Sequence, residues 1–391
     1  MTGDRCTVAR DPGGDGVPQL AHSPAILDEL AHDLRAAGLV DGRLDAAKLI
    51  YLAVTSRLHD RPVSVVVKGP SSAGKSWLMQ TVLAFHPARA EYELSAMSEK
   101  ALAYSKADLR HRMLVIYEAA GLGGEFASYL LRSLLSEGRI RYETVQSGPD
   151  GFQPKVVERE GPTGLLSTTT AIMLHPENET RLFSVAVADT PESQQAVFAQ
   201  WGAAAAGGER VKVDYGRWHS LVDWLETGER EVVIPYGPRL AGLLPPHAMR
   251  LQRDFIATLS LIKACALLHR ATRDRDDQGR IVATLADYAE VRALVEPIIA
   301  AGVEAAVKPE TRATVQAVAQ LLPGHPGGID LTVLTERLKL DKGSVSRRVK
   351  DAREVGYLVN QETTNGRPAR IVLGKPMPTD AIVLPLLEVL R

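Results

Sequence analysis

The sequence predicts an α/β fold built on a parallel β-sheet, followed by a helical segment and by a small separate domain at the C-terminus. Three observations support this prediction. Residues 61–68 form a valine-rich run that is typical of a buried strand. A stretch rich in Gly and Ser follows at 69–76, and residues 77–83 then show helical spacing. From residue 336 to residue 375 the chain carries ten Lys and Arg against five Asp and Glu, which sets this segment apart.

The composition of the 391-residue chain is that of a soluble globular protein, with 45% hydrophobic and 24% charged residues. No apolar run approaches the ~20 residues of a membrane span, and the N-terminus shows no apolar signal segment. Cys6 and Cys265 are too few for a disulfide framework or a multi-cysteine zinc site. We therefore expect a cytoplasmic protein without membrane contact. The formal net charge of −1 argues against a uniformly basic coat for nucleic acid.

The stretch at 69–76 has the pattern G-x-x-x-x-G-K-S between a strand and a helix, the context that distinguishes a phosphate-binding loop from a chance match. Its residues are Gly69, Pro70, Ser71, Ser72, Ala73, Gly74, Lys75 and Ser76. The glycines let backbone N–H groups close around phosphates, and the helix N-terminus adds a positive dipole end. Lys75 would contact the γ-phosphate, and the Ser76 hydroxyl would bind Mg²⁺. The sequence thus predicts a site for ATP and Mg²⁺.

The remaining elements are predicted from the same kinds of pattern. Residues 1–22 are rich in Gly, Pro and Asp and are expected to be disordered, and two amphipathic helices are expected between 23 and 58. The patterns then predict strands at 92–94, 112–118, 163–170 and 184–188, helices at 99–109 and 126–136, and a β-hairpin at 139–145 and 152–158. Residues 201–208 are rich in Ala and Gly and predict a flexible connection.

Two predicted strand ends carry residues suited to ATP hydrolysis. Glu118 ends the apolar strand after the loop, where phosphate-loop ATPases place the carboxylate that orients the attacking water. Tyr117 stands where an Asp near Mg²⁺ is expected. On the next core strand, Thr168 or Thr169 would lie beside the γ-phosphate and hold that water. The plainer alternatives are an acidic residue with no role at a strand end, and a threonine run that only favours β-structure.

Two further arginine positions are candidates for contact with the nucleotide. Arg181 precedes the last core strand, where it would reach the nucleotide of a neighbouring subunit and stabilise charge on the transferred phosphoryl group. An ordinary surface arginine is the alternative. Arg250 and Arg253 open a helical segment at 245–308 and would reach the nucleotide from a lid. Cys265 and His269 in the same segment are interpreted as packing residues.

The last 80 residues predict a winged helix. Helices are expected at 310–322, 331–338 and 344–355, followed by a hairpin whose tip is at 363–367. The net charge of +5 between 336 and 375 is the electrostatic pattern expected of a DNA-binding domain. The candidate DNA-binding residues on the third helix and the wing are Ser344, Ser346, Arg347, Lys350 and Arg367. Because winged helices also dock proteins, a protein partner is the alternative.

Taken together, these residues resemble an AAA+ ATPase of the branch that carries a β-hairpin before the sensor-1 strand. The chain is most similar to the MCM-like helicase modules of primase–helicase proteins from phages, plasmids and other mobile elements. The resemblance covers about residues 48–356. It depends on the stretches 69–76, 131–140, 177–181 and 253–269.

The resemblance implies a role for each candidate residue. Lys75 and Ser76 would contact phosphate and metal, Glu118 would be the catalytic carboxylate, and Thr168 or Thr169 would be sensor 1. Arg181 would act in trans as an arginine finger, and Arg253, with Arg250 as the alternative, would be sensor 2. Arg141 and Lys155 on the hairpin would grip DNA in a ring channel. Tyr117 departs from the family pattern, and the zinc-finger and polymerising domains of full primase–helicases are missing, so primer synthesis is not predicted.

The sequence therefore predicts a phosphate-loop ATPase of four parts: a tail at 1–22, N-terminal helices and the ATPase core at 23–240, a helical lid at 241–308, and the winged-helix domain at 309–391. The expected function is that of an ATP-dependent DNA helicase, translocase or replication-initiation ATPase that assembles as a homo-oligomeric ring, expected to be a hexamer. One alternative is a DNA-binding regulator that ATP switches and that hydrolyses slowly. The other is an ATPase that remodels protein.

Overall fold

The chain forms two compact units, each with its own hydrophobic core. The first unit comprises Met1–Ile298 and Leu384–Arg391, and the second comprises Ile299–Val383. The computed structural model describes residues 16–95, 97–118, 124–148, 151–170, 181–187, 190–207, 212–244, 249–305, 307–362, 364, 367–377 and 383–390. The predicted tail at 1–22 and the predicted wing tip at 363–367 lie largely outside these residues.

A five-stranded parallel sheet lies at the centre of the first unit. Its strand order is β2-β3-β6-β1-β7, and the strands are β1 (Val65–Lys68), β2 (Glu91–Leu94), β3 (Arg112–Ile116), β6 (Thr163–Thr169) and β7 (Phe183–Ala186). All neighbouring strands of this sheet pair in parallel, so the carboxyl ends of the five strands lie at the same edge. β6 lies between β1 and β3, and this order brings the segments that follow these three strands next to one another.

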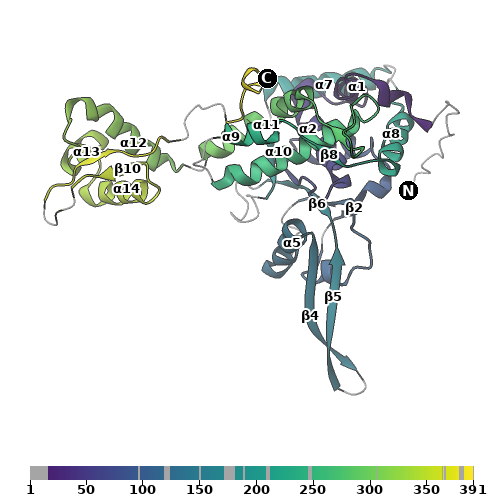
Figure 1. Cartoon of the computed structure of the whole chain (residues 1–391), viewed down its shortest axis with the longest axis horizontal. Helices are drawn as coiled ribbons and strands as arrows, with labels where there is room; N and C mark the ends of the chain where they lie inside the picture. The colour runs from purple at the N-terminus through teal and green to yellow at the C-terminus, as the bar shows by residue number, and fades with distance from the viewer. Residues whose placement is uncertain are drawn as a thin grey trace. The chain divides into compact units, whose positions relative to one another are not determined.

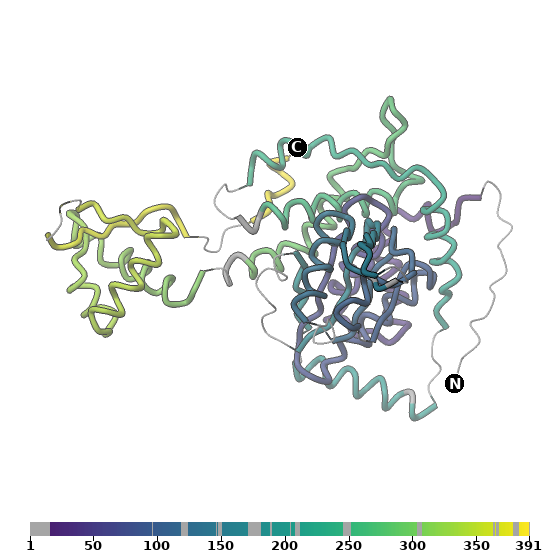
Figure 2. The backbone as a smooth tube through the Cα atoms, turned by 90° about the horizontal axis from the view of Figure 1, so that it is seen from below, coloured from purple at the N-terminus to yellow at the C-terminus, as the bar shows by residue number. Residues whose placement is uncertain are grey.

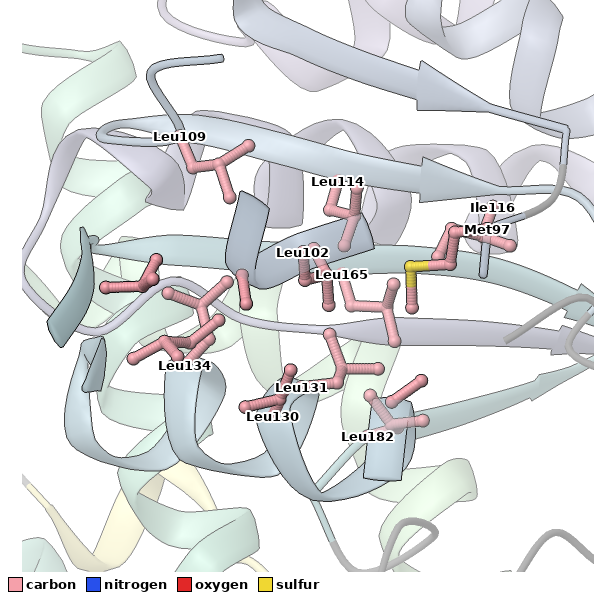
Figure 3. Packing of buried hydrophobic residues seen from close by; sticks show 14 of the residues in the cluster. Met97, Leu102, Leu109, Leu114, Ile116, Leu130, Leu131, Leu134, Leu165 and Leu182 are labelled. Carbon is pink, nitrogen blue, oxygen red and sulfur yellow. The ribbon is translucent and has the colours of Figure 1, made fainter. Parts of the chain in front are cut away.

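One face of the sheet packs on helix α5 (Glu125–Glu137) and the short helix α4 (Ala101–Tyr104). Leu114 and Ile116 alternate along β3 with residues of the opposite face, and they belong to the same buried cluster as Leu130 and Leu134 of α5 (Figure 3). All four of these side chains are at most 2% exposed. This apolar layer holds the sheet rigid beneath the edge where β1, β3 and β6 end.

Helices account for most of the remaining first unit. They are α1 (Ile26–Ala36), α2 (Leu44–Thr55), α3 (Lys75–Leu83), α7 (Pro191–Ala205), α8 (Tyr215–Thr227), α9 (Gly237–Gly242), α10 (Met249–Leu268) and α11 (Leu285–Ala305), of which α11 continues into the second unit. Short 3-10 helices lie at Gln19–His22, Asp41–Arg43, Ser56–Leu58 and Ala88–Ala90, and β8 (Val232–Val233) pairs with β9 (Ile281–Val282). α2 packs on both α3 and α10.

A long β-hairpin is inserted between β3 and β6. Among the described residues, β4 (Arg139–Gly148) and β5 (Gly151–Glu160) pair only with each other, through ten residue pairs from Arg139–Glu160 to Gly148–Gly151. Figure 1 shows the hairpin extending away from the sheet of its own unit. Its base is anchored in the core by Ile140 and Val157, whereas Val145 and Phe152 near its far end are 62% and 82% exposed.

The second unit contains three helices and a two-stranded sheet. The helices are α12 (Pro309–Leu321), α13 (Leu331–Leu338) and α14 (Lys342–Glu354), and β10 (Leu358–Asn360) pairs antiparallel with β11 (Ile371–Leu373). Ile329 forms a further bridge with Ile371. Val318, Leu334 and Val345, one from each helix, form the centre of its core.

The structure differs from the sequence-based expectations at several element ends. α4 is four residues long instead of spanning 99–109, because Ser105 and Asp108 accept hydrogen bonds from nearby backbone N–H groups and end the helix. The expected flexible connection at 201–208 is helical as far as Ala205, since alanine favours helix strongly. Residues 19–22 form a 3-10 helix with Leu20 and Ala21 buried. The last residues return to the first unit (Figure 2), where the hydroxyl of Tyr288 donates to the carbonyl of Pro385.

Candidate nucleotide-binding site

The loop between β1 and α3 has a backbone that only certain residues can adopt. Gly74, at the start of α3, has φ +75°, the left-handed region that glycine enters without strain. Gly69 lies so close to its neighbour that a Cβ there would be 2.7 Å from the carbonyl oxygen of Val187. The two glycines of the motif are therefore required by the turn itself, and the turn directs the first N–H groups of α3 toward one point.

Lys75 is only 7% exposed, which is unusual for a charged side chain. Its Nζ donates hydrogen bonds to the carbonyl oxygens of Gly69 at 3.0 Å and Pro70 at 2.7 Å. The ammonium group is thus held inside the turn, next to the N-terminus of α3. Ser76, one residue later, is exposed and available to a ligand. This arrangement suits an anion with a bound divalent cation.

Glu118 follows β3 in a backbone conformation that is costly for any residue other than glycine. Its φ is +66°, and its backbone N–H donates to the hydroxyl of Thr168 at 2.9 Å. Thr168 is opposite Val67 of β1 in the sheet register and is 2% exposed. The hydrogen bond ties the end of β3 to the end of β6, directly beside β1 and its loop. Thr169, the other candidate, is equally buried and lies opposite Lys68.

Tyr117 lies between β3 and Glu118, at the position where the resemblance of the sequence implies an Asp. Burial and the nearby carboxylates of Glu93 and Glu91 raise the pKa of Tyr117 to about 12. Its hydroxyl is therefore protonated and neutral at pH 7. Because Mg²⁺ prefers charged oxygen ligands, Tyr117 is a weaker metal ligand than the expected Asp.

The two candidate arginine positions lie on different elements. The Nε of Arg181 donates to the hydroxyl of Ser136 at 2.8 Å, near the C-terminal end of α5. Residues 177–180 of the same motif lie outside the described residues. Arg253 is exposed in the first turns of α10, and Arg250 belongs to the same helix. The structure thus places Arg181 beside α5 of the same chain.

The candidate DNA-binding residues are all on the surface. Arg141 is in the third residue pair of the hairpin counted from its base, with its Nε 3.4 Å from a carboxylate oxygen of Glu158. Lys155 lies halfway along the hairpin, and its Nζ is 5.9 Å from the ring centroid of Tyr104. In the second unit, Ser346, Arg347 and Lys350 are exposed on α14, Ser344 is half-buried in its first turn, and Arg367 is exposed before β11.

Two residues beside the loop were not among the sequence-based candidates. Arg43, at the end of a 3-10 helix before α2, extends its guanidinium to Gly74, where a Cβ would be 2.6 Å from Nη1. Trp77 follows Ser76 in α3 and is 52% exposed. Trp77 is adjacent to the motif and could have been noticed. No local pattern connects Arg43 with a loop thirty residues later.

A buried cluster in the helical segment has the residue types of a metal site. Ligand atoms of Cys265, His269 and Asp287 lie within 4.8 Å of one another. However, Asp287 accepts hydrogen bonds from Arg273 at 3.0 Å and from both the N–H and the hydroxyl of Thr284. The Asp287 carboxylate is thus already paired with the guanidinium of Arg273. Burial also raises the pKa of the Cys265 thiol well above its usual value. The geometry agrees with the interpretation of Cys265 and His269 as packing residues.

Comparison with known proteins finds a family match within the first part of the chain. Residues 32–156 match the family model described as the MTBMA_p00010 P-loop domain. No curated protein matches the chain. Among solved structures, the chain is similar to a full-length MCM homolog from Methanopyrus kandleri, with 14% identity over 75% of this chain and a TM-score of 0.48. The chain spans 62% of the length of that homolog.

No helix within the described ranges has the length and apolar character to cross a membrane. The matched P-loop domain contains the glycine loop, β3, Glu118 and most of the hairpin. With the five-stranded parallel sheet, this match shows that the chain has the α/β core of a P-loop ATPase and, in that core, a nucleotide-binding loop.

Proposed function

We propose that the protein is an ATP-dependent DNA helicase or translocase, or a replication-initiation ATPase of a mobile element, that works as a homo-oligomeric ring. The observation that carries the proposal is the strand order of the sheet. Because β6 lies between β1 and β3, the phosphate loop, Thr168 and Glu118 meet at one edge, joined by the hydrogen bond from Glu118 to Thr168. These groups suit phosphate binding and the positioning of the attacking water in ATP hydrolysis.

In the proposed mechanism, Lys75 binds the β- and γ-phosphates, and the Ser76 hydroxyl takes part in holding Mg²⁺. Glu118 orients the attacking water as its general base, and Thr168 keeps the Glu118 backbone in position. Mg²⁺, when bound with ATP, would neutralise charge on the phosphates. Arg253 would contribute a positive charge to the same nucleotide from α10.

Arg181 is proposed to act on the nucleotide of a neighbouring subunit. Its guanidinium is next to Ser136, on the α5 side of its own sheet. A ring in which that side meets the phosphate loop of the next subunit would bring Arg181 to a second ATP, with a hexamer as the expected size. The hairpin would then enter the channel of the ring and contact single-stranded DNA.

The second unit is proposed to be a winged helix that binds duplex DNA. Three helices followed by β10 and β11, with a third strand contact at Ile329, match that topology. α14 would be the recognition helix, because it carries Arg347 and Lys350 on its exposed face and the region around it has a net charge of +5.

One alternative is favoured by a specific observation. The neutral Tyr117 hydroxyl replaces a carboxylate near the metal, which would slow hydrolysis. The protein would then be a DNA-binding regulator in which ATP controls assembly and is only slowly hydrolysed.

ATP hydrolysis with and without single-stranded DNA tests the proposal, using the wild type, Lys75→Ala, Glu118→Gln and Arg181→Ala. A motor shows DNA-stimulated turnover that each substitution reduces at least a hundredfold, and it displaces one strand of a duplex. Ser136→Ala is the matched control for Arg181, because it removes the hydrogen bond from the Nε of Arg181 to the Ser136 hydroxyl and keeps the guanidinium. Binding of ATP with background turnover and no strand displacement would instead support the regulator.

A further inference from the structure

Arg43 lies against the phosphate loop although it belongs to the N-terminal helices. It ends a 3-10 helix at Asp41–Arg43, directly before α2, and α2 packs on α3. Its Nη1 is 2.6 Å and its Cζ is 3.4 Å from the point where a Cβ on Gly74 would lie. Only a glycine at that position lets the guanidinium approach so closely.

The guanidinium of Arg43 lacks the acceptors that a half-buried cation requires. Its Nε is buried and makes no hydrogen bond, and within the described parts of the chain the side chain forms no ion pair. By contrast, Arg35, eight residues earlier, is paired with Asp41 at 2.6 Å. A half-buried, unpaired guanidinium is costly to the fold, and an anion bound at the loop would provide the missing acceptors.

Trp77 provides a second observation on the same side of the loop. The residue follows Ser76 in α3, and its indole is 52% exposed, the largest half-exposed side chain next to the motif. Its Cζ2 is 3.9 Å from the Cβ position of Gly38, in the segment that leads to Arg43. An exposed aromatic face beside a phosphate site can stack on a nucleobase.

We propose that Arg43 binds the phosphate chain of the nucleotide as a second cation beside Lys75, and that Trp77 stacks on its base. The inference rests on the proposed nucleotide site and adds the residues that recognise the nucleoside end. It also gives the N-terminal helices a role, because binding of the nucleotide joins the segment at 38–43 to the loop.

Calorimetric binding of Mg·ATP and of Mg·triphosphate, the inorganic anion, to the full chain tests this proposal. Arg43→Gln weakens binding of both ligands about tenfold or more, because the phosphate contact is common to them. Trp77→Leu weakens binding of ATP about fivefold and leaves triphosphate unchanged, because only ATP has a base. Arg35→Gln, which removes a positive charge from α1 shortly before that segment, leaves both affinities at the wild-type value.

Two further variants make each outcome decisive. Arg43→Lys keeps the charge and recovers part of the lost affinity, which separates phosphate binding from a loss of folding. Wild-type affinity or tighter binding in Arg43→Gln would overturn the role of Arg43 and show that its side chain only covers the loop. An equal loss for both ligands in Trp77→Leu would overturn the stacking role.

If Lys75→Ala binds ATP as well as the wild type does, the nucleotide site itself is wrong, which is a different result from failure at Arg43 alone.

Discussion

Thr168 shows how one hydroxyl can set the position of the backbone at Glu118, the candidate catalytic residue. Its side chain accepts the N–H of Glu118, whose φ of +66° is unfavourable without such support. The carboxylate that would orient water is thus placed by a residue on the neighbouring strand. An acidic residue at a strand end is common, and this contact is what distinguishes Glu118 from an ordinary one.

Thr168→Val is expected to lower the turnover number about tenfold or more while the affinity for ATP changes little. The substitution removes the acceptor of the Glu118 N–H and lets the carboxylate move, but it leaves the phosphate loop intact. Steady-state kinetics with separate binding measurements would separate the two effects.

Thr163→Val is the matched control on the same strand. The Thr163 hydroxyl donates to the carbonyl of Leu109 at the opposite end of β6. Both substitutions should reduce stability by about 1–2 kcal/mol, because each leaves a polar group unpaired. An equal fall in turnover for both variants would show that Thr168 acts only through stability.

At the scale of elements, the hairpin is independent of the sheet that carries the site. Among the described residues, β4 and β5 form strand pairs only with each other, and the base of the hairpin contributes Ile140 and Val157 to the core, with Tyr142 packed against it. The far end exposes Val145 and Phe152. An element of this kind can change its contacts without disturbing the nucleotide loop.

Replacing residues 144–155 by Asn-Gly is expected to preserve folding and ATP binding and to abolish stimulation of hydrolysis by DNA. Glu143 and Val156 are directly opposite, so a two-residue turn closes the shortened hairpin. The measurements are thermal unfolding and ATPase activity against single-stranded DNA concentration. Arg141→Ala in the full-length hairpin is measured in parallel, because Arg141 lies near the base beside Glu158 and is kept in the shortened hairpin. The comparison separates the contribution of the base from that of the far end. Unchanged DNA stimulation after truncation would remove the hairpin from the proposed mechanism.

At the scale of the whole molecule, buried histidines make stability depend on pH. Burial lowers the pKa of His59 to about 4, with the nearby charge of Lys263 contributing, and burial lowers the pKa of His86 well below its usual value. Both are neutral in the folded protein. In the unfolded chain they bind protons below about pH 6.5, so the free energy of unfolding falls as pH decreases from 6.5 toward 4.

His86→Phe is expected to reduce this acid sensitivity by about 1.4 kcal/mol per pH unit below pH 6.5. The aromatic ring keeps the packing against Tyr51, whose ring centroid is 4.5 Å away, and removes the group that the unfolded state protonates. Chemical denaturation between pH 7 and pH 5 measures the effect. His22→Gln, at an exposed position, should leave the slope of the wild type unchanged. The same slope in His86→Phe as in the wild type would contradict the assignment.

Much of the fold and part of the site could be predicted from local patterns. The phosphate loop, β3 with Glu118, the hairpin and α13 were predicted close to their observed positions because each depends on neighbouring residues. α4 and α7 were not, since the ends of α4 are decided by side-chain hydrogen bonds and the continuation of α7 by the helix propensity of alanine.

The sequence by itself determined the chemistry of the loop, because a Gly-Lys-Ser motif between a strand and a helix contains its own backbone requirements and its own charge. Only the tertiary structure decided which distant residues join that loop. The sheet order brings Thr168 to Glu118, and the packing of α2 on α3 brings Arg43 to Gly74. Such contacts depend on how separate elements pack, and spacing along the chain carries no record of that packing.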